Sequence, residues 1–167
     1  MQLRVSRLSS PSPDDLPFEI VERKGHGHPD TLCDSLAEAA SIGLSRYYLE
    51  HFGAILHHNV DKALLLGGAA RPAFGGGKVL KPIEITLAGR ATRRFRGITV
   101  PVEALVMEFS REWLAANVSN LEPRDVRIIP RIRETSSDLA ALFLRQSISG
   151  MPLANDTSCG VGFAPLD

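Results

Sequence analysis

The sequence predicts an α+β domain with a mixed or antiparallel sheet that carries helices on one face. Short segments of alternating apolar residues are separated by long segments in which apolar residues recur every three or four positions. The expected order is strand, helix, strand, strand, helix, strand, helix, strand, and no parallel crossover unit is repeated along it. A chain of 167 residues has the size of one ordinary domain.

The first expected elements are a short strand and a long helix. Residues 17–24 alternate apolar and charged side chains, which predicts a strand that ends at a glycine-rich turn. From Pro29 onward apolar residues follow a helical spacing, and Gly53 supplies a stop signal. We expect residues 1–16 to form an N-terminal segment that can be flexible, and residues 17–167 to form the domain.

The middle of the chain is expected to form a strand pair and a second long helix. Strands centred on residues 63–66 and over residues 81–95 should pair antiparallel, with the glycine-rich residues 71–77 as the loop between them. Residues 101–117 begin with a proline and place apolar side chains on one face, which predicts the helix.

The last part of the chain is expected to add a strand, a helix and the start of another strand. Residues 125–134 read as a strand that Pro130 interrupts. Residues 136–146 read as a short capped helix, and residues 155–167 as a polar turn followed by a strand that has barely begun. A strand without a pairing partner leads us to expect an incomplete chain.

The composition argues against several classes of protein. A formal net charge of zero is unusual for a general nucleic-acid binder, which needs a basic excess. Cys33 and Cys159 are far apart and form no CxxC motif, which argues against a zinc ribbon and fits a reducing compartment. No apolar run reaches the ~18 to 20 residues of a membrane helix. We expect a soluble cytoplasmic protein without nucleic-acid or membrane partners.

The segment KGHGHPDTLCD, residues 24–34, is the main candidate for chemistry, and three interpretations of it remain open. The first is a helix N-terminus without further function. Pro29 suits a first helical turn. The carboxylates of Asp30 and Asp34 would each stabilise the helix by ~0.3 to 1 kcal/mol through their interaction with the helix dipole. This interpretation gives the histidines no role.

The second interpretation is a metal-dependent hydrolase. His26, His28 and Asp30 form an HxHxD pattern that is similar to the HxHxDH signature of metallo-β-lactamase-fold hydrolases. Thr31 replaces the last histidine of that signature. All five histidines precede residue 59, so no later histidine can complete such a site.

The third interpretation is a phosphate-handling site. Exposed N–H groups at a helix start and a neighbouring imidazole can hold an anionic leaving group. Asp30 could hold Mg²⁺, which binds one or two carboxylates together with phosphate oxygens and water. Asp34 and Glu38 follow Asp30 at four-residue spacing, and a bound cation would offset their mutual repulsion.

Other polar segments carry weaker signals. Residues 74–78 (FGGGK) lack the spacing of a P-loop and favour a hairpin turn, while the four arginines within residues 90–96 favour a solvated strand end or a phosphate or partner contact. Asp61 and Lys62 stand at a strand entrance without a specific role of their own. Residues 155–158 (NDTS) read as an Asx turn.

Several long segments together resemble the archaeal type of S-adenosylmethionine synthetase, also called methionine adenosyltransferase. They occur in this order from residue 18 to residue 167: VERKGHGHPDTLCD, YYLEHFG, ILHHNVDKALLLGG, FGGGKVLKPIEITLAGRAT and PLANDTSCGVGFAPL. The resemblance implies the N-terminal portion of an enzyme that joins ATP to L-methionine, expels triphosphate and cleaves it to pyrophosphate and phosphate. It therefore favours the phosphate-handling interpretation.

The resemblance also implies roles for individual residues. His28 corresponds to the catalytic histidine of the family's GHPD motif, which stabilises charge on the leaving triphosphate. Asp30 corresponds to the carboxylate that binds Mg²⁺, and Mg²⁺ and K⁺ are the implied cofactors. The residues implied to bind substrate are Lys24, Asp61, Lys62, Asn155 and Asp156.

The family's architecture is implied to be three similar α+β units around a pseudo-threefold axis, with active sites shared across a homodimer. Members of the family are more than twice as long as this chain. Their remaining part carries further charged residues for phosphates and metals, so we expect the chain alone to be inactive. A short non-catalytic relative that binds nucleotide or another subunit remains the alternative.

Overall fold

The computed structural model describes residues 5–7, 11, 15–18, 20–119 and 121–135. The helices and strands named below belong to one unit of the chain, and the N-terminal segment belongs to another. Neither long helix in this part of the chain combines the length and the apolar character needed to span a membrane.

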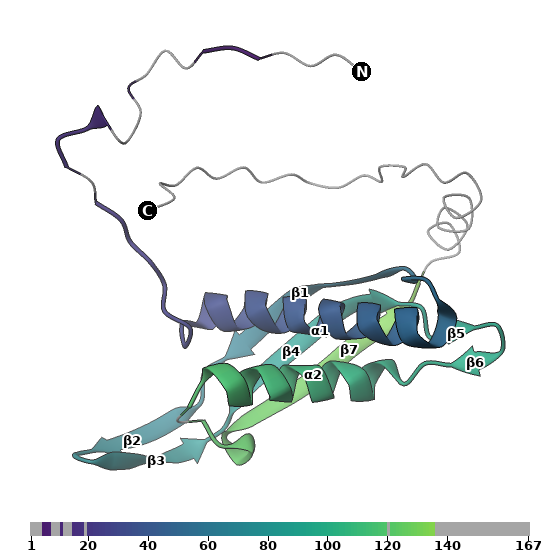
Figure 1. The fold of residues 1–167 in the computed structure, drawn as a ribbon. Coiled ribbons are helices and arrows are strands. Elements are labelled where there is room, and N and C mark those ends of the chain that lie inside the picture. Colours follow the sequence, from purple (N-terminus) through teal and green to yellow (C-terminus); the bar gives the residue numbers. More distant parts are fainter. Residues whose placement is uncertain (1–4, 8–10, 12–14, 19, 120, 136–167) are drawn as a thin grey trace. The chain divides into compact units, whose positions relative to one another are not determined.

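The centre of the fold is a three-stranded sheet with the strand order β1, β4, β7 (Figure 1). β1 (His58–Leu66) pairs antiparallel with β4 (Ile83–Ala91), and β4 pairs parallel with β7 (Val126–Glu134). The predicted mixed sheet is therefore confirmed. The predicted interruption at Pro130 is wrong, because β7 runs continuously through this residue. β7 is at the edge of the described sheet, where the missing N–H of a proline is tolerated.

Both long helices, α1 (Pro29–Phe52) and α2 (Val102–Asn117), cover the same face of this sheet (Figure 1). The predicted arrangement of helices on one face is thus confirmed. The helix predicted over residues 101–117 begins one residue later, because Pro101 is its N-cap. Gly53 ends α1 as predicted, with a left-handed φ of 71° that favours glycine.

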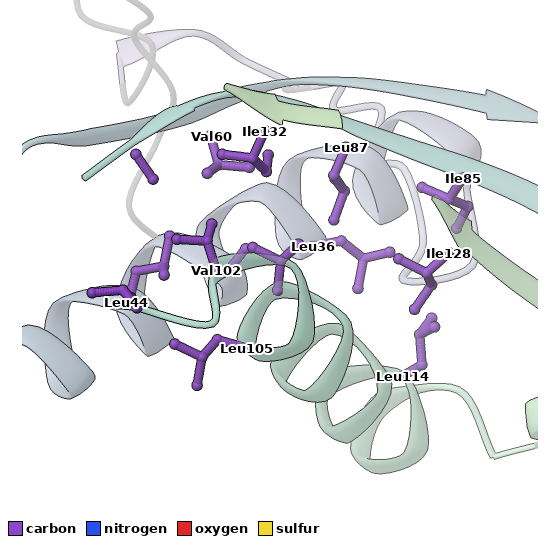
Figure 2. Packing of buried hydrophobic residues seen from close by; sticks show 14 of the residues in the cluster. Leu36, Leu44, Val60, Ile85, Leu87, Val102, Leu105, Leu114, Ile128 and Ile132 are labelled. Atoms are coloured by element: carbon purple, nitrogen blue, oxygen red, sulfur yellow. The ribbon is translucent and has the colours of Figure 1, made fainter. Parts of the chain in front are cut away.

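Apolar side chains from the helices and the sheet form one core between the two layers (Figure 2). Gly43 allows α1 and α2 to approach closely, because a Cβ atom there would lie 1.9 Å from Cδ2 of Phe109. This packing holds α1 in place and thereby positions its N-terminus. Members of the core with no exposed surface include Leu36, Leu44, Tyr48, Ile85, Leu87, Val102 and Val106.

A hairpin extends from the connection between β1 and β4. Its strands, β2 (Ala69–Ala73) and β3 (Gly76–Lys81), pair antiparallel, and the turn between them leaves Phe74 fully exposed. The loop predicted over residues 71–77 is therefore mostly paired strand, since the glycines permit a tight turn that lets both sides of the segment pair. The other short elements are β5 (Arg94–Phe95) and β6 (Ile98–Thr99), which pair with each other, and the 3-10 helix η2 (Pro123–Asp125).

The strand predicted over residues 17–24 is wrong. The described residues of this segment have no strand structure, and the side chains of Phe18 and Ile20 are exposed. Alternation is not sufficient for a strand, because the backbone N–H and C=O groups of a strand also need hydrogen-bond partners on a neighbouring strand. The helix predicted over residues 136–146 and the segment 155–167 lie outside the described residues.

Candidate functional site

The N-terminus of α1 is capped by a histidine side chain. His28 has an extended backbone (φ −66°, ψ 138°), and its Nδ1 atom accepts a hydrogen bond from the backbone N–H of Asp30 at 3.1 Å. The backbone N–H of His28 donates to the carbonyl oxygen of Gly25 at 3.0 Å, which closes the turn before the helix. Pro29 occupies the first helical position, where its missing N–H costs no hydrogen bond. The predicted helix N-terminus is therefore confirmed, but the expectation that its capping does not involve the histidines is wrong.

The cap determines which ring nitrogen of His28 carries the proton. An Nδ1 atom that accepts a hydrogen bond must present its lone pair, so the proton of the neutral ring lies on Nε2. The side chain is exposed, and no described residue bonds to Nε2. His28 can therefore donate an Nε2–H hydrogen bond to an anion at the positive end of the helix.

Lys24 and Asp30 form an ion pair beside this cap, with side chains that are 52% and 61% exposed. The hydrogen bond from Lys24 and its positive charge lower the pKa of Asp30. The Asp30 carboxylate consequently stays ionised at neutral pH. An imidazole donor, an ammonium group and a carboxylate thus lie together at the helix start, and such a set can bind a phosphate, a cation or both.

The described residues contain no group of three or more His, Cys, Asp or Glu side chains that could hold a metal ion. Catalytic zinc takes three protein ligands, so this part of the chain does not support the zinc hydrolase interpretation. Asp34 and Glu38, whose spacing suggests a cation shared with Asp30, instead line a surface groove with Trp113 of α2. Mg²⁺ remains compatible with Asp30 alone, because water and phosphate oxygens supply the rest of its coordination.

The second group of candidate residues lies on a β-bulge in β1. The pairing of β1 with β4 shifts between Asn59 and Lys62, and Asp61 and Lys62 are both exposed whereas Val60 is buried. The bulge therefore turns two consecutive side chains away from the core. Gly89 of β4 makes room for it, because a Cβ atom there would lie 2.0 Å from the carbonyl oxygen of Asn59. Asp61 and Lys62 form an ion pair of 2.6 Å.

The two groups do not converge in the described part of the chain. α1 and β1 run antiparallel, so the N-terminus of α1 lies at the same end of the fold as the C-terminal end of β1 (Figure 1). Lys62 lies about 13 Å along the strand from Leu66, at ~3.3 Å per residue. No hydrogen bond or ion pair among the described residues joins the two groups. Asn155 and Asp156 lie outside the described residues.

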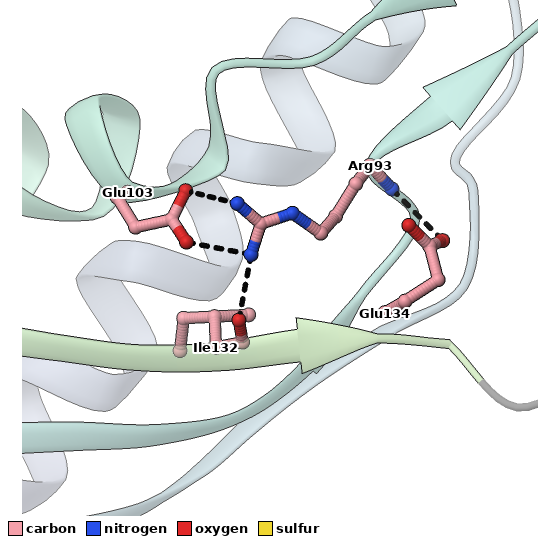
Figure 3. Close-up of polar contacts among 4 residues, drawn as sticks. All are labelled: Arg93, Glu103, Ile132 and Glu134. Atoms are coloured by element: carbon pink, nitrogen blue, oxygen red, sulfur yellow. Dashed lines mark hydrogen bonds and ion pairs between the residues drawn. The ribbon is translucent and has the colours of Figure 1, made fainter.

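The four arginines of residues 90–96 do not form one patch. The guanidinium group of Arg93 points towards α2, where it contacts the carboxylate of Glu103 at 2.6 and 2.7 Å (Figure 3). It also donates to the carbonyl oxygen of Ile132 at 2.7 Å, and the backbone N–H of Arg93 donates to the carboxylate of Glu134 at 3.2 Å. Arg93 therefore joins α2 to β7, which is a structural role.

The histidine pair at the start of β1 is also structural. His57 is 6% exposed, and its Nδ1 atom lies 3.0 Å from Oγ1 of Thr135. Burial lowers the pKa of His57, and the neighbouring His58 and Arg90 lower it further. His58 places its Nε2 atom 3.1 Å from Oγ of Ser41 on α1. The signal for this role is the apolar context of the pair in the segment ILHHNV.

Comparisons with known proteins point to one family. A family model described as S-adenosylmethionine synthetase (AdoMet synthetase) matches residues 1–167. A probable S-adenosylmethionine synthase of Aquifex aeolicus is 62% identical over 152 residues, which are 89% of this chain and 38% of the relative. The S-adenosylmethionine synthases of Caldivirga maquilingensis and Aeropyrum pernix are 46% and 49% identical, and they match 97% and 99% of this chain. The matches cover 41% and 42% of these two relatives, so the chain spans about two fifths of their length.

Proposed function

Since the chain belongs to the S-adenosylmethionine synthetase family, whose members are methionine adenosyltransferases, we propose that the protein makes S-adenosylmethionine from ATP and L-methionine. In this reaction the methionine sulfur attacks C5′ of ATP, triphosphate leaves, and the same site hydrolyses it to pyrophosphate and phosphate. The observation that supports the proposal is the arrangement of an imidazole donor and a lysine–aspartate ion pair at the N-terminus of α1.

We propose His28 as the catalytic residue that stabilises the leaving group. Negative charge grows on the triphosphate as the bond from its oxygen to C5′ breaks. The Nε2–H of His28 and the positive end of α1 both favour an anion at this position. A preorganised donor that faces developing charge typically contributes ~10² to 10³ to kcat.

Asp30 is the proposed carboxylate for Mg²⁺, and its exposed, ionised side chain fits that ion. When bound, Mg²⁺ would neutralise charge on the phosphate oxygens. The ammonium group of Lys24 is paired with the carboxylate of Asp30. Binding of Mg²⁺ to that carboxylate would free the ammonium group of Lys24 to bind the phosphates. We propose K⁺ as a second cofactor on the basis of the family resemblance alone.

The other proposed substrate-binding residues lie away from this helix end. Asp61 and Lys62 are exposed on the bulge of β1, while Asn155 and Asp156 are proposed from the family resemblance alone. Because the two described groups do not converge, we propose that the active site is shared between the subunits of a homodimer. The chain by itself would then be inactive.

A chimera tests the proposed function. In it, the part of this chain that matches the Aquifex aeolicus relative, at 62% identity over 152 residues, replaces the corresponding segment of that relative. With ATP, methionine, Mg²⁺ and K⁺, the chimera should form S-adenosylmethionine, pyrophosphate and phosphate, whereas the chain alone should form none. A chimera that folds and assembles like its parent but makes no product would instead support a non-catalytic relative that binds nucleotide or another subunit.

A further inference from the structure

The β2–β3 hairpin is a positively charged arm with an aromatic tip that projects from the end of the sheet (Figure 1). Residues 69–81, called the basic arm below, contain three positively charged residues and no negatively charged one. Arg71 and Lys78 are directly opposed on the two strands, and like charges at such positions destabilise the pairing. Phe74 at the tip is fully exposed. Since a lone two-stranded hairpin is only marginally stable, an acidic and apolar partner would stabilise the arm.

The carboxylates beside the basic arm are already engaged. Glu122 and Asp125 line the open groove next to the arm. Glu122 forms an ion pair of 2.8 Å with Arg124, and the carboxylate of Asp125 accepts the backbone N–H of Glu122 at 3.1 Å. Within the described part of the chain, no ion pair joins Arg71 or Lys78 to a carboxylate. The positive charge of the arm is therefore free to meet a partner.

A groove between α1 and α2 has the opposite charge and is also partly apolar. It has a volume of about 380 Å³ and is called the acidic groove below; its lining residues are Asp34, Ser35, Glu38, Ala39, Ile42 and Trp113. Asp34 and Glu38 are exposed and stand four residues apart on α1, so their charges repel each other. No cation among the described residues forms an ion pair with either of them. The side chain of Ile42 is 42% exposed.

We propose that the basic arm of one copy of the chain docks in the acidic groove of a second copy. Each surface carries a pair of like charges without a partner, and the two pairs have opposite signs. Their spacings also match, because opposed strand positions lie ~5 Å apart and residues four apart in a helix lie ~6 Å apart. Arg71 and Lys78 can therefore contact Asp34 and Glu38 together, which relieves both repulsions at once.

The aromatic tip of the arm suits the apolar part of the acidic groove. Phe74 would pack against the indole ring of Trp113 and the exposed side chain of Ile42. An aromatic pair is favourable beyond the apolar area that it buries, and burial would remove the exposed phenyl ring from water. Phe74 thus serves as the apolar anchor of the contact, and the two charge pairs orient the arm around it.

The contact is head-to-tail, because each copy uses one surface for the arm and a different surface for the groove. It includes neither the helix start at His28 nor the bulge at Asp61, so it does not rest on the proposed function. It is also distinct from a homodimer that shares an active site. A contact formed by one hairpin and one groove is small, so we expect it to be weak.

Sedimentation velocity of the purified 167-residue chain tests the proposal. The mass of the unmodified chain should increase with concentration. R71E/K78E and D34K/E38K should each raise the concentration needed for this association at least about tenfold, because each places like charges across the contact. The fourfold variant R71E/K78E/D34K/E38K should restore association to within about threefold, since its charges again have opposite signs.

R46E/R94E is the matched control, because it reverses two exposed positive charges outside the arm. It should leave the association within about twofold of the unmodified chain, since separated exposed charges are screened. A homodimer formed through another surface would persist in every variant and would not respond to the charge reversals. Failure of the fourfold variant to restore association, or equal association in the unmodified chain and both reversal variants, would overturn the proposal.

Trp113 gives a second measurement, which does not require the charge-reversal variants to fold. It is the single tryptophan of the chain, so its fluorescence reports on the acidic groove alone. Emission should shift to shorter wavelength as the concentration of the unmodified chain rises, because docking removes the indole ring from water. About 500 mM salt should reverse much of the shift by screening the charge pairs, and F74S should abolish it. Emission that does not depend on concentration, or that shifts equally in F74S, would also overturn the proposal.

Discussion

The Nδ1 atom of His28 accepts the backbone N–H of Asp30, so the same ring caps α1 and leaves its Nε2–H for another partner. The cap and the proposed catalytic donor are therefore opposite nitrogens of one imidazole. A substitution that keeps the cap and removes the distal N–H separates the two roles. Asparagine does this, because it is among the best N-cap residues.

The capping role predicts a difference between two substitutions of His28 in the chain alone. His28→Ala should lower the free energy of unfolding by about 0.5 to 2 kcal/mol, whereas His28→Asn should cost only a few tenths. His26→Ala is the control, because no hydrogen bond joins its side chain to the described residues. Urea unfolding followed by circular dichroism measures all three. Equal losses for alanine and asparagine at position 28 would show that the cap contributes nothing.

The ion pair between Lys24 and Asp30 predicts a pH dependence. Because Lys24 lowers the pKa of Asp30 in the folded chain, the pair stabilises the fold above the ordinary aspartate value of 3.8. That contribution is lost as the pH falls through the lowered pKa. Lys24→Gln should therefore raise the pKa of Asp30 towards 3.8 in an NMR titration of its carboxyl carbon. Identical titration midpoints in the two proteins would mean that the pair does not form in solution.

The close approach at Gly89 predicts a strong effect of one added methyl group. Gly89→Ala would place a Cβ atom 2.0 Å from the carbonyl oxygen of Asn59, which a rigid strand cannot avoid. We expect a loss of about 1 to 3 kcal/mol in the free energy of unfolding, the usual cost of overpacking. Gly76→Ala is the matched control, because no atom lies within 4 Å of its added Cβ. Similar unfolding midpoints for both variants would contradict the bulge geometry that exposes Asp61 and Lys62.

The proposed role of Asp30 predicts an altered magnesium requirement in the chimera. Asp30→Asn keeps the backbone N–H that bonds to His28, but a neutral amide is a poor Mg²⁺ ligand. The Mg²⁺ concentration for half-maximal S-adenosylmethionine formation should therefore rise strongly. Asp34→Asn, which changes a carboxylate in the groove beside Trp113, should leave it unchanged. An unchanged Mg²⁺ requirement in Asp30→Asn would show that Asp30 does not bind the metal and only forms a surface ion pair with Lys24.

Features whose signals lie close together in the chain were predictable from the sequence. α1 was predictable from the three- and four-residue spacing of its apolar side chains and from the stop signal of Gly53. Each of these signals can be read from a few neighbouring residues. The antiparallel pairing of β1 and β4 follows from the nearness of two apolar runs in the chain. The strand expected over residues 17–24 failed because alternation says nothing about whether a partner strand exists.

Features that depend on a particular side-chain contact between two elements were not predictable. The bulge at Asp61 and Lys62 requires the absent side chain of Gly89 on another strand, and no local pattern reports that contact. Arg90 and Arg93 are close in the chain, yet the end of β4 sends them to opposite sides of the sheet. The imidazole cap was missed because histidine is not a common N-cap, so its two roles in one turn became visible only in three dimensions.

The central claim is that His28 stabilises the leaving triphosphate in addition to capping α1. Steady-state S-adenosylmethionine formation by the chimera, measured for His28→Asn and His26→Asn, tests it most directly. We predict that His28→Asn lowers kcat by about 10² to 10³ with the fold intact, as expected for the loss of one preorganised donor, and that His26→Asn stays near full turnover. Near-full turnover in His28→Asn would contradict the claim, whether or not His26→Asn loses activity.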